Sequence, residues 1–276
     1  MATAFRFLTF TSDYGLEDEF VGVCHGVIKR FAPDVEILDL SHAIPPQDVR
    51  AGANVLAQAV PFMPAAVHLA IVDPGVGTRR RSVVVGTKSG PPLVGPDNGL
   101  LSLAAEALGG ATQAHEIARE DLFLQPVSRT FHGRDIFAPV AARLALGMDP
   151  AEVGPEFPVA ELVHLDQAGA RVDDDHVHGQ IIQTDHFGNL QLNVAREELE
   201  SLGIMLGDLV ELRVGGKAHA VQLCQTFAEV PVGRLAVLED SYRRIAIAVN
   251  QGNASKRLEA RRGDPVILAR AQKPAS

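Results

Sequence analysis

The chain has 276 residues, 46% hydrophobic and 21% charged, which suffices for one large domain or two ordinary ones, each with its own core. Its formal net charge of -9 argues against nucleic acid and anionic membranes as partners. No apolar run approaches the roughly 20 residues that span a bilayer, and nothing resembles a signal peptide. The two cysteines, Cys24 and Cys224, lie in apolar runs and are expected to be buried, reduced thiols. These features predict a globular cytoplasmic protein.

Short β-rich runs alternate with helical stretches through the first half of the chain. Alternation and β-branched residues predict strands at 5–10, 36–40, 67–72 and 82–85, and helical periodicity predicts helices at 20–30, 49–60 and 100–108. Strand and helix in repetition predict an α/β domain with a mostly parallel sheet over residues 1–165.

Turn-forming polar clusters follow several of these strands, at 11–15, 73–78 and 95–99. Ligands of open parallel sheets bind beyond the carboxyl ends of the strands. A functional site is therefore expected in these loops.

A polar stretch at 166–178 is predicted to be a linker. Beyond it, strands are expected at 179–184, 209–214, 217–221, 235–238 and 244–249, with one helix at 195–202. Short strands separated by Gly or Asp turns predict a smaller, mostly antiparallel, barrel-like β-domain over 179–276.

Three polar residues of the first domain are candidates for catalysis. Asp73 ends an apolar run and precedes Pro74 and two glycines, although an isolated Asp-Pro-Gly is more often a simple turn. Arg80 belongs to an arginine run that would ordinarily be solvated, but it could fold back to hold Asp73 by bidentate hydrogen bonds. His132 lies in a polar cluster before an apolar helix at 136–146, and such a histidine is more often a structural or capping residue. If it faces Asp73, the two side chains could orient a water molecule.

Other polar groups leave further interpretations open. An Asx-rich turn is the ordinary explanation of 184–189, whereas a functional site would use the Asn189 amide to recognise a purine edge and the Asp185 charge to meet an ammonium group. CxxC and HExxH spacings are missing, so no metal is expected. Asp13, Asp73 and Asp97 could nevertheless be the Mg²⁺ ligands of a phosphatase or nuclease.

Seven blocks, taken together and in order, carry a resemblance that covers nearly the whole chain. The sequence resembles the S-adenosyl-L-methionine (SAM) hydroxide adenosyltransferase family, which is related to the fluorinating and chlorinating enzymes that act on SAM. The blocks are 11–15 (TSDYG), 41–46 (SHAIPP), 72–78 (VDPGVGT), 95–99 (GPDNG), 130–135 (TFHGRD), 185–189 (DHFGN) and 248–254 (AVNQGNA).

The resemblance implies an enzyme that hydrolyses SAM to adenosine and methionine without a cofactor. Family catalytic residues fall on Asp73, Arg80 and His132. The resemblance also implies a homotrimer that binds SAM at the subunit interface. The implied substrate contacts are Asp13 to the ribose, together with Asp185, Phe187, Asn189, Ser241 and the backbone of Val249.

Departures from the halogenating relatives favour water as the nucleophile. This chain has His132 and Gly133 where those enzymes carry tyrosine and a small polar residue, and Asp73 and Val76 where the fluorinating enzymes have tyrosine and threonine. An ionised Asp73 would also repel a halide at close range. A chlorinase-like halogenase and a non-catalytic SAM- or adenosine-binding protein are the alternatives.

Overall fold

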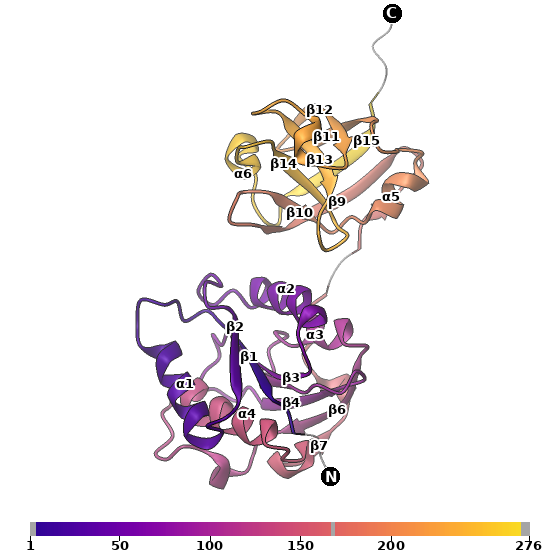
Figure 1. Ribbon diagram of the computed structural model, residues 1–276. Helices are drawn as coiled ribbons and strands as arrows, with labels where there is room; N and C mark the ends of the chain where they lie inside the picture. Colours follow the sequence, from indigo (N-terminus) through magenta and orange to yellow (C-terminus); the bar gives the residue numbers. More distant parts are fainter. Residues whose placement is uncertain (1–3, 167–168, 272–276) are drawn as a thin grey trace, which may run out of the picture. The chain divides into compact units, whose positions relative to one another are not determined.

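The computed structural model describes residues 4–166 and 169–271. The chain divides into two compact units, residues 1–165 and 166–276 (Figure 1). The predicted linker at 166–178 falls in the second unit, where β8 (Arg171–Val172) and the start of β9 (His176–Thr184) already form sheet. Its residues 167–168 lie outside the described residues.

A seven-stranded sheet in the order β2-β1-β3-β5-β4-β6-β7 forms the centre of the first unit. The β1–β2, β1–β3 and β3–β5 pairs are parallel, and the β5–β4, β4–β6 and β6–β7 pairs are antiparallel. The α/β class is confirmed, and the parallel part is β2-β1-β3-β5. Only a short turn joins β4 to β5, and a parallel pair would need a longer crossover. The strands are β1 (Phe7–Ser12), β2 (Glu36–Ser41), β3 (Ala66–Ile71), β4 (Ser82–Thr87), β5 (Leu93–Pro96), β6 (Ala111–Glu116) and β7 (Glu156–Phe157).

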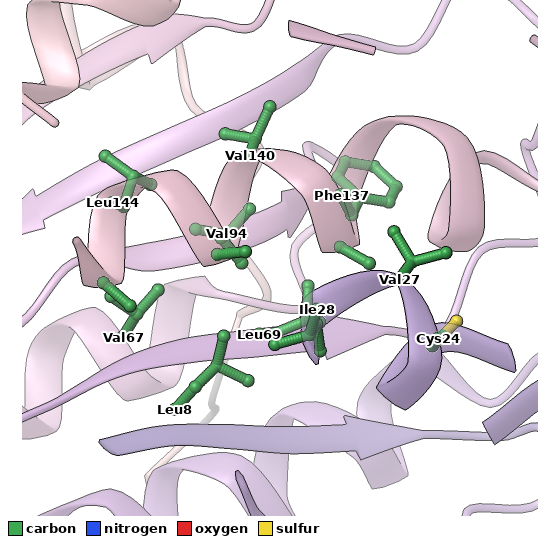
Figure 2. Close-up of a cluster of buried hydrophobic side chains, with 14 of the residues drawn as sticks. Leu8, Cys24, Val27, Ile28, Val67, Leu69, Val94, Phe137, Val140 and Leu144 are labelled. Atoms are coloured by element: carbon green, nitrogen blue, oxygen red, sulfur yellow. The ribbon is translucent and has the colours of Figure 1, made fainter. Parts of the chain in front are cut away.

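Helices cover both faces of this sheet, as the alternation of buried side chains along β3 shows. Val67 and Leu69 pack in one core with helices α1 and α4 (Figure 2), whereas Ala70 packs in another with α2 and α3. A π-helical turn, η3, leads directly into α4. The helices are α1 (Phe20–Phe31), α2 (Val49–Ala59), α3 (Ser102–Ala107), η3 (Gly133–Phe137) and α4 (Ala138–Ala145), with 3-10 turns η1 (Val60–Phe62), η2 (Glu120–Leu122), η4 (Pro150–Val153) and η5 (Val159–Glu161).

The second unit is a seven-stranded barrel, which confirms the predicted barrel-like β-domain. Its strands follow the order β10-β14-β13-β12-β11-β15-β9, and pairing of β9 with β10 closes the ring. Every pair in the ring is antiparallel except β12–β13, and β8 adds to β9 outside it. The further elements are β10 (Leu190–Leu192), α5 (Arg196–Ser201), β11 (Leu209–Val214), β12 (Lys217–Cys224), η6 (Phe227–Glu229), β13 (Leu235–Glu239), β14 (Ile245–Val249), α6 (Ala254–Leu258) and β15 (Pro265–Arg270).

Most predicted elements occur within two residues of their expected ends, and β11 matches at both. Both cysteines are buried and free, as predicted. Among the described residues, no helix has the length and apolar character needed to cross a membrane.

Candidate active site

The polar loops predicted to form a site follow parallel strands of the first unit. Register pairs Ser12 at the end of β1 with Ile71 at the end of β3, and the backbone N–H of Asp13 donates to the Ile71 carbonyl at 3.3 Å. Because β1 and β3 end together, Asp13 and Asp73 follow strands that finish at the same edge of the sheet.

The loop after β3 is a tight turn with its own hydrogen bonds. The Val76 N–H donates to the Asp73 carbonyl at 3.2 Å, and the Thr78 hydroxyl donates to the Gly75 carbonyl at 2.7 Å. Gly77 has φ +76°, and a β-carbon there would collide with the Arg129 carbonyl oxygen. Only glycine therefore allows this loop to pack against the segment before His132.

Arg80 folds back onto Asp73, as the functional interpretation of the arginine run requires. Its Nε lies 3.0 and 3.1 Å from the two carboxylate oxygens, and its Nη2 lies 2.5 Å from Oδ2. Both side chains are nearly buried, at 10% exposed for Arg80 and 6% for Asp73. Nη1 donates to the Ser82 hydroxyl at 2.7 Å, and the guanidinium lies 5.1 Å from the centre of the Phe137 ring. The carboxylate is thus held rigidly by a delocalised cation.

The same guanidinium joins Asp73 to His132. Arg80 Nη2 lies 3.1 Å from His132 Nδ1. Arginine has no acceptor, so Nδ1 must accept this hydrogen bond, and a neutral imidazole then carries its proton on Nε2. We refer to Asp73, Arg80 and His132 as the Asp73 cluster.

Burial and the neighbouring Arg80 charge both lower the pKa of His132, and they outweigh the opposing effects of Asp73 and Asp135. The neutral ring that the Arg80 contact requires is therefore also the favoured form at neutral pH. A neutral Nε2–H is a hydrogen-bond donor, whereas the ionised Asp73 is an acceptor.

Asp13 and Tyr14 extend the site along the end of β1. Asp13 Oδ2 accepts the Gln47 backbone N–H at 2.8 Å. The Tyr14 ring makes an edge contact with the Phe131 ring, and the two ring centres lie 5.7 Å apart. Burial raises the pKa of the Tyr14 hydroxyl well above its usual value. A β-carbon at Gly133 would collide with that hydroxyl. Sequence reasoning did not single out Tyr14 as a site residue, because only the fold packs it against Gly133.

Asp97 is not part of the Asp73 cluster. Arg81 holds its carboxylate through Nε at 2.9 Å and Nη2 at 2.8 Å, and the Val163 N–H donates to Oδ1 at 2.8 Å. A Mg²⁺ site needs carboxylate oxygens that are free to bind the ion, whereas arginine side chains already bind the carboxylates of Asp73 and Asp97. This arrangement argues against the phosphatase or nuclease interpretation.

In the second unit, Asp185 and Asn189 close the turn between β9 and β10. The Asn189 backbone N–H donates to Asp185 Oδ1 at 2.8 Å, and its side-chain amide donates to Oδ2 at 2.7 Å. A β-carbon at Gly188, where φ is +85°, would collide with the side chain of Asn253. This turn therefore packs against the loop that follows β14. Phe187, at its tip, is 72% exposed.

Val249 and Ser241 flank the same strand, β14, at opposite ends. Val249 is its last residue, close to the Asp185 turn, because Leu190 pairs with Ile247. Ser241 lies in the turn before β14 that Asp240 closes by accepting the backbone N–H groups of Tyr242 and Arg244. The five residues of β14 span roughly 17 Å. The structure thus groups Asp185, Asn189 and Val249 and leaves Ser241 apart.

Fold and site together define a two-unit protein whose α/β unit presents a preorganised carboxylate and a neutral imidazole at the ends of parallel strands. Residues 8–154 match the SAM hydroxide adenosyltransferase N-terminal domain, and residues 179–267 match the C-terminal domain of that family. The chain belongs to the SAM hydroxide adenosyltransferase family, which confirms the resemblance seen in the sequence.

Individual relatives agree with this membership. A Salinispora tropica protein named (R)-S-adenosyl-L-methionine hydrolase is 49% identical over 257 residues, covering 93% of this chain and 95% of the relative. A fluorinase from Nocardia brasiliensis is 27% identical over 270 residues, covering 88% of this chain and 90% of the relative. The crystal structure of an uncharacterized conserved protein from Thermotoga maritima superposes with a TM-score of 0.90 at 38% identity, covering 95% of this chain and all of that one.

Proposed function

We propose that this chain hydrolyses (R)-S-adenosyl-L-methionine to adenosine and L-methionine by displacement at the ribose C5′ carbon. The high identity to the Salinispora tropica hydrolase over nearly the whole chain supports the substrate and the reaction. The single structural observation that carries the proposal is Arg80 Nη2, which contacts both Asp73 and His132. The Asp73 carboxylate and the His132 imidazole can together hold a nucleophilic water molecule by hydrogen bonds.

The leaving group needs no help from the protein. When the C5′–S bond breaks, its electron pair stays on sulfur, and the sulfonium becomes the neutral thioether of methionine. No general acid is therefore required. The protein must instead position the water in line with the breaking bond, at about 3 Å from C5′, and this alone can lower the barrier by several kcal/mol.

Asp73 and His132 hold that water from two sides. One water O–H donates to the Asp73 carboxylate, and the His132 Nε2–H donates to one water lone pair, which leaves the other lone pair free for C5′. As the C5′–O bond forms, the water becomes a protonated alcohol, which is a far stronger acid than a carboxylic acid. Asp73 therefore accepts the proton, and His132 orients the water.

Arg80 organises this pair without contacting the reacting atoms. Its bidentate hydrogen bonds hold the Asp73 carboxylate in one orientation, and its contact with His132 Nδ1 selects the Nε2–H tautomer. Groups fixed before the substrate arrives lower the barrier more than groups that must reorganise during the reaction.

The remaining substrate contacts belong to the same proposal. Asp13 binds the ribose hydroxyls, and Asp185, Phe187, Asn189, Ser241 and the Val249 backbone bind the rest of SAM. The distance between the two ends of β14 supports contacts with two different parts of an extended ligand. Two buried free cysteines support a cytoplasmic location.

We also propose a homotrimer that binds SAM at the subunit interface. Light scattering of the purified protein measures the assembly. A monomer at concentrations that support full activity would contradict it.

Turnover of each SAM epimer in ¹⁸O-labelled water tests the reaction. We expect the (R) epimer to give methionine and adenosine with the label at its 5′-oxygen. Formation of 5′-chloro-5′-deoxyadenosine in chloride would indicate a halogenase. Binding of SAM without product release would indicate a non-catalytic binding protein, and either result would overturn the proposal.

A further inference from the structure

Two imidazoles and a carboxylate meet beside the edge strand of the first unit. His25 extends from α1, Asp39 from β2, and His42 follows β2 directly. His25 Nε2 lies 2.9 Å from Asp39 Oδ1, and His42 Nε2 lies 3.0 Å from the same oxygen. One potential ligand atom from each residue lies within 4.8 Å of the others. Two nitrogens thus converge on a single carboxylate oxygen.

The orientation of His42 is set from the other side of its ring. Its side chain is only 3% exposed, and Nδ1 lies 2.7 Å from the buried Ser12 hydroxyl. Nε2 is buried and has no hydrogen bond of good geometry among the described residues, although the Asp39 oxygen is close. Metal-ligating histidines commonly have the second ring nitrogen held by a hydrogen bond, as Ser12 holds Nδ1 here, and this leaves the buried Nε2 as the potential ligand.

We propose that His25, Asp39 and His42 bind a divalent transition-metal ion of the zinc class. Imidazole nitrogen and carboxylate oxygen in a two-to-one ratio suit Zn²⁺ and its neighbours in the first row, whereas Mg²⁺ and Ca²⁺ prefer oxygen ligands alone. Asp39 and His25 are 40% and 31% exposed, so an ion reaches them from solvent. The site departs from the expectation of no metal, which rested on ligand spacing in the sequence.

The bound ion has a structural role in this proposal, because His42 also supports the end of β1. Its backbone carbonyl accepts the Gly15 N–H at 2.8 Å, and Ser12 Oγ, its side-chain partner, accepts the Tyr14 N–H at 3.3 Å. The ion therefore links α1 and β2 to the loop that contains Asp13. We expect it to stabilise the fold and this loop without entering the reaction.

A second cluster, on the β8–β9 hairpin, is the control for this proposal. Asp173, His176 and His178 also lie within the distance of a shared ion. Asp173 is already satisfied, however, because it accepts the backbone N–H groups of Asp175 and His176, and His178 Nε2 lies 2.7 Å away. The His178 contact is the main cause of the lowered pKa of Asp173, about 2. An ion at either cluster would displace a histidine from its carboxylate, but at Asp173 it would also have to compete with two backbone N–H groups.

Co²⁺ and Zn²⁺ titration of the chelator-stripped full chain tests the proposal. Co²⁺ absorption and a competing chromogenic chelator report stoichiometry and affinity, and thermal unfolding reports stabilisation. We expect one tight site, at least about tenfold weaker in His25→Gln and unchanged in His178→Gln. Asp39→Asn provides a further variant. The side chains of His25, His178 and Asp39 are all partly exposed, so their replacement leaves the core intact.

Three results would overturn the proposal. They are the lack of any stoichiometric site in the wild type, a site lost in His178→Gln but kept in His25→Gln, and binding that survives in both His25→Gln and Asp39→Asn. Because none of these measurements uses SAM, failure of the metal site leaves the proposed hydrolysis untouched. Hydrolysis could likewise fail while the ion binds.

Discussion

Arg80 donates to both carboxylate oxygens of Asp73, seven residues earlier in the chain, from a position where both side chains are nearly buried. The turn between them contains Pro74, Gly75 and Gly77, and it reverses the chain tightly enough for a long side chain to reach back. A charge held in this way needs no reorganisation when substrate binds.

Replacing Asp73 by asparagine removes the proton acceptor and keeps the shape of the side chain. We expect kcat for SAM hydrolysis to fall by about 10²–10⁴-fold, with KM changed only a few-fold. Asp97→Asn is the matched control, since Asp97 pairs with Arg81 away from the cluster. That control should lower the free energy of unfolding by roughly 1–3 kcal/mol and leave kcat nearly unchanged. Equal losses of kcat in the two variants would contradict the assigned role.

Lysine in place of Arg80 keeps the charge but cannot hold two carboxylate oxygens and His132 together. We expect kcat to fall by roughly 10–100-fold, as positioning errors in active sites commonly cause. Arg79→Lys changes an exposed neighbour in the same run and should behave as wild type. Steady-state kinetics of both variants make the comparison, and full activity in Arg80→Lys would show that charge alone suffices.

The pH profile of kcat/KM reports the protonation of His132. Burial and Arg80 lower its pKa, so the folded protein keeps the ring neutral down to a pH below the ordinary value of 6.5. Protonation at lower pH places a proton on Nδ1 and breaks the contact with Arg80. We therefore expect activity to be retained through pH 6.5 and lost only below it. An acid limb centred above pH 6.5 in the wild type would contradict a lowered pKa for His132.

Gly133→Ala tests the close approach of Tyr14. The added methyl would collide with the Tyr14 hydroxyl and lie 3.1 Å from Ile71 Cδ1. Overpacking of this kind should lower the free energy of unfolding by about 1–3 kcal/mol, measured by urea denaturation. Adding Tyr14→Phe removes the colliding oxygen and should recover part of the loss. A double variant no more stable than Gly133→Ala would place the strain elsewhere.

His68 makes the free energy of unfolding depend on pH. Burial lowers its pKa from 6.5 to about 4, and Thr9 Oγ1 lies 2.8 Å from its Nδ1. The neutral form is favoured in the folded state, so the stabilisation is complete above pH 6.5 and is lost as the pH falls toward 4. The loss should approach roughly 3 kcal/mol. Urea unfolding at pH 7 and pH 4.5 measures it, and His68→Gln should show a smaller difference between the two.

Much of the fold was predictable because local patterns decide it. β11 (Leu209–Val214) buries every second side chain, which is the alternation that its sequence displays. Turn residues such as Gly77 and Gly188 marked the loops, because only glycine tolerates their backbone angles beside close neighbours. Ordered blocks such as 72–78 also pointed to the Asp73 cluster through the family resemblance.

Tertiary structure decided most of the other side-chain contacts. In the run 79–81, Arg79 faces solvent, Arg80 reaches Asp73 and Arg81 reaches Asp97. The sequence offered the Arg80–Asp73 pair as one interpretation of this run, but it gave no sign of the Arg81–Asp97 pair. Likewise His25, Asp39 and His42 have no motif spacing and converge only because α1 packs beside β2. Hydrophobic periodicity depends only on residues that are close in the sequence. Contacts such as these depend on how segments far apart in the sequence pack together. That packing is set by burial of the apolar faces of whole helices and strands.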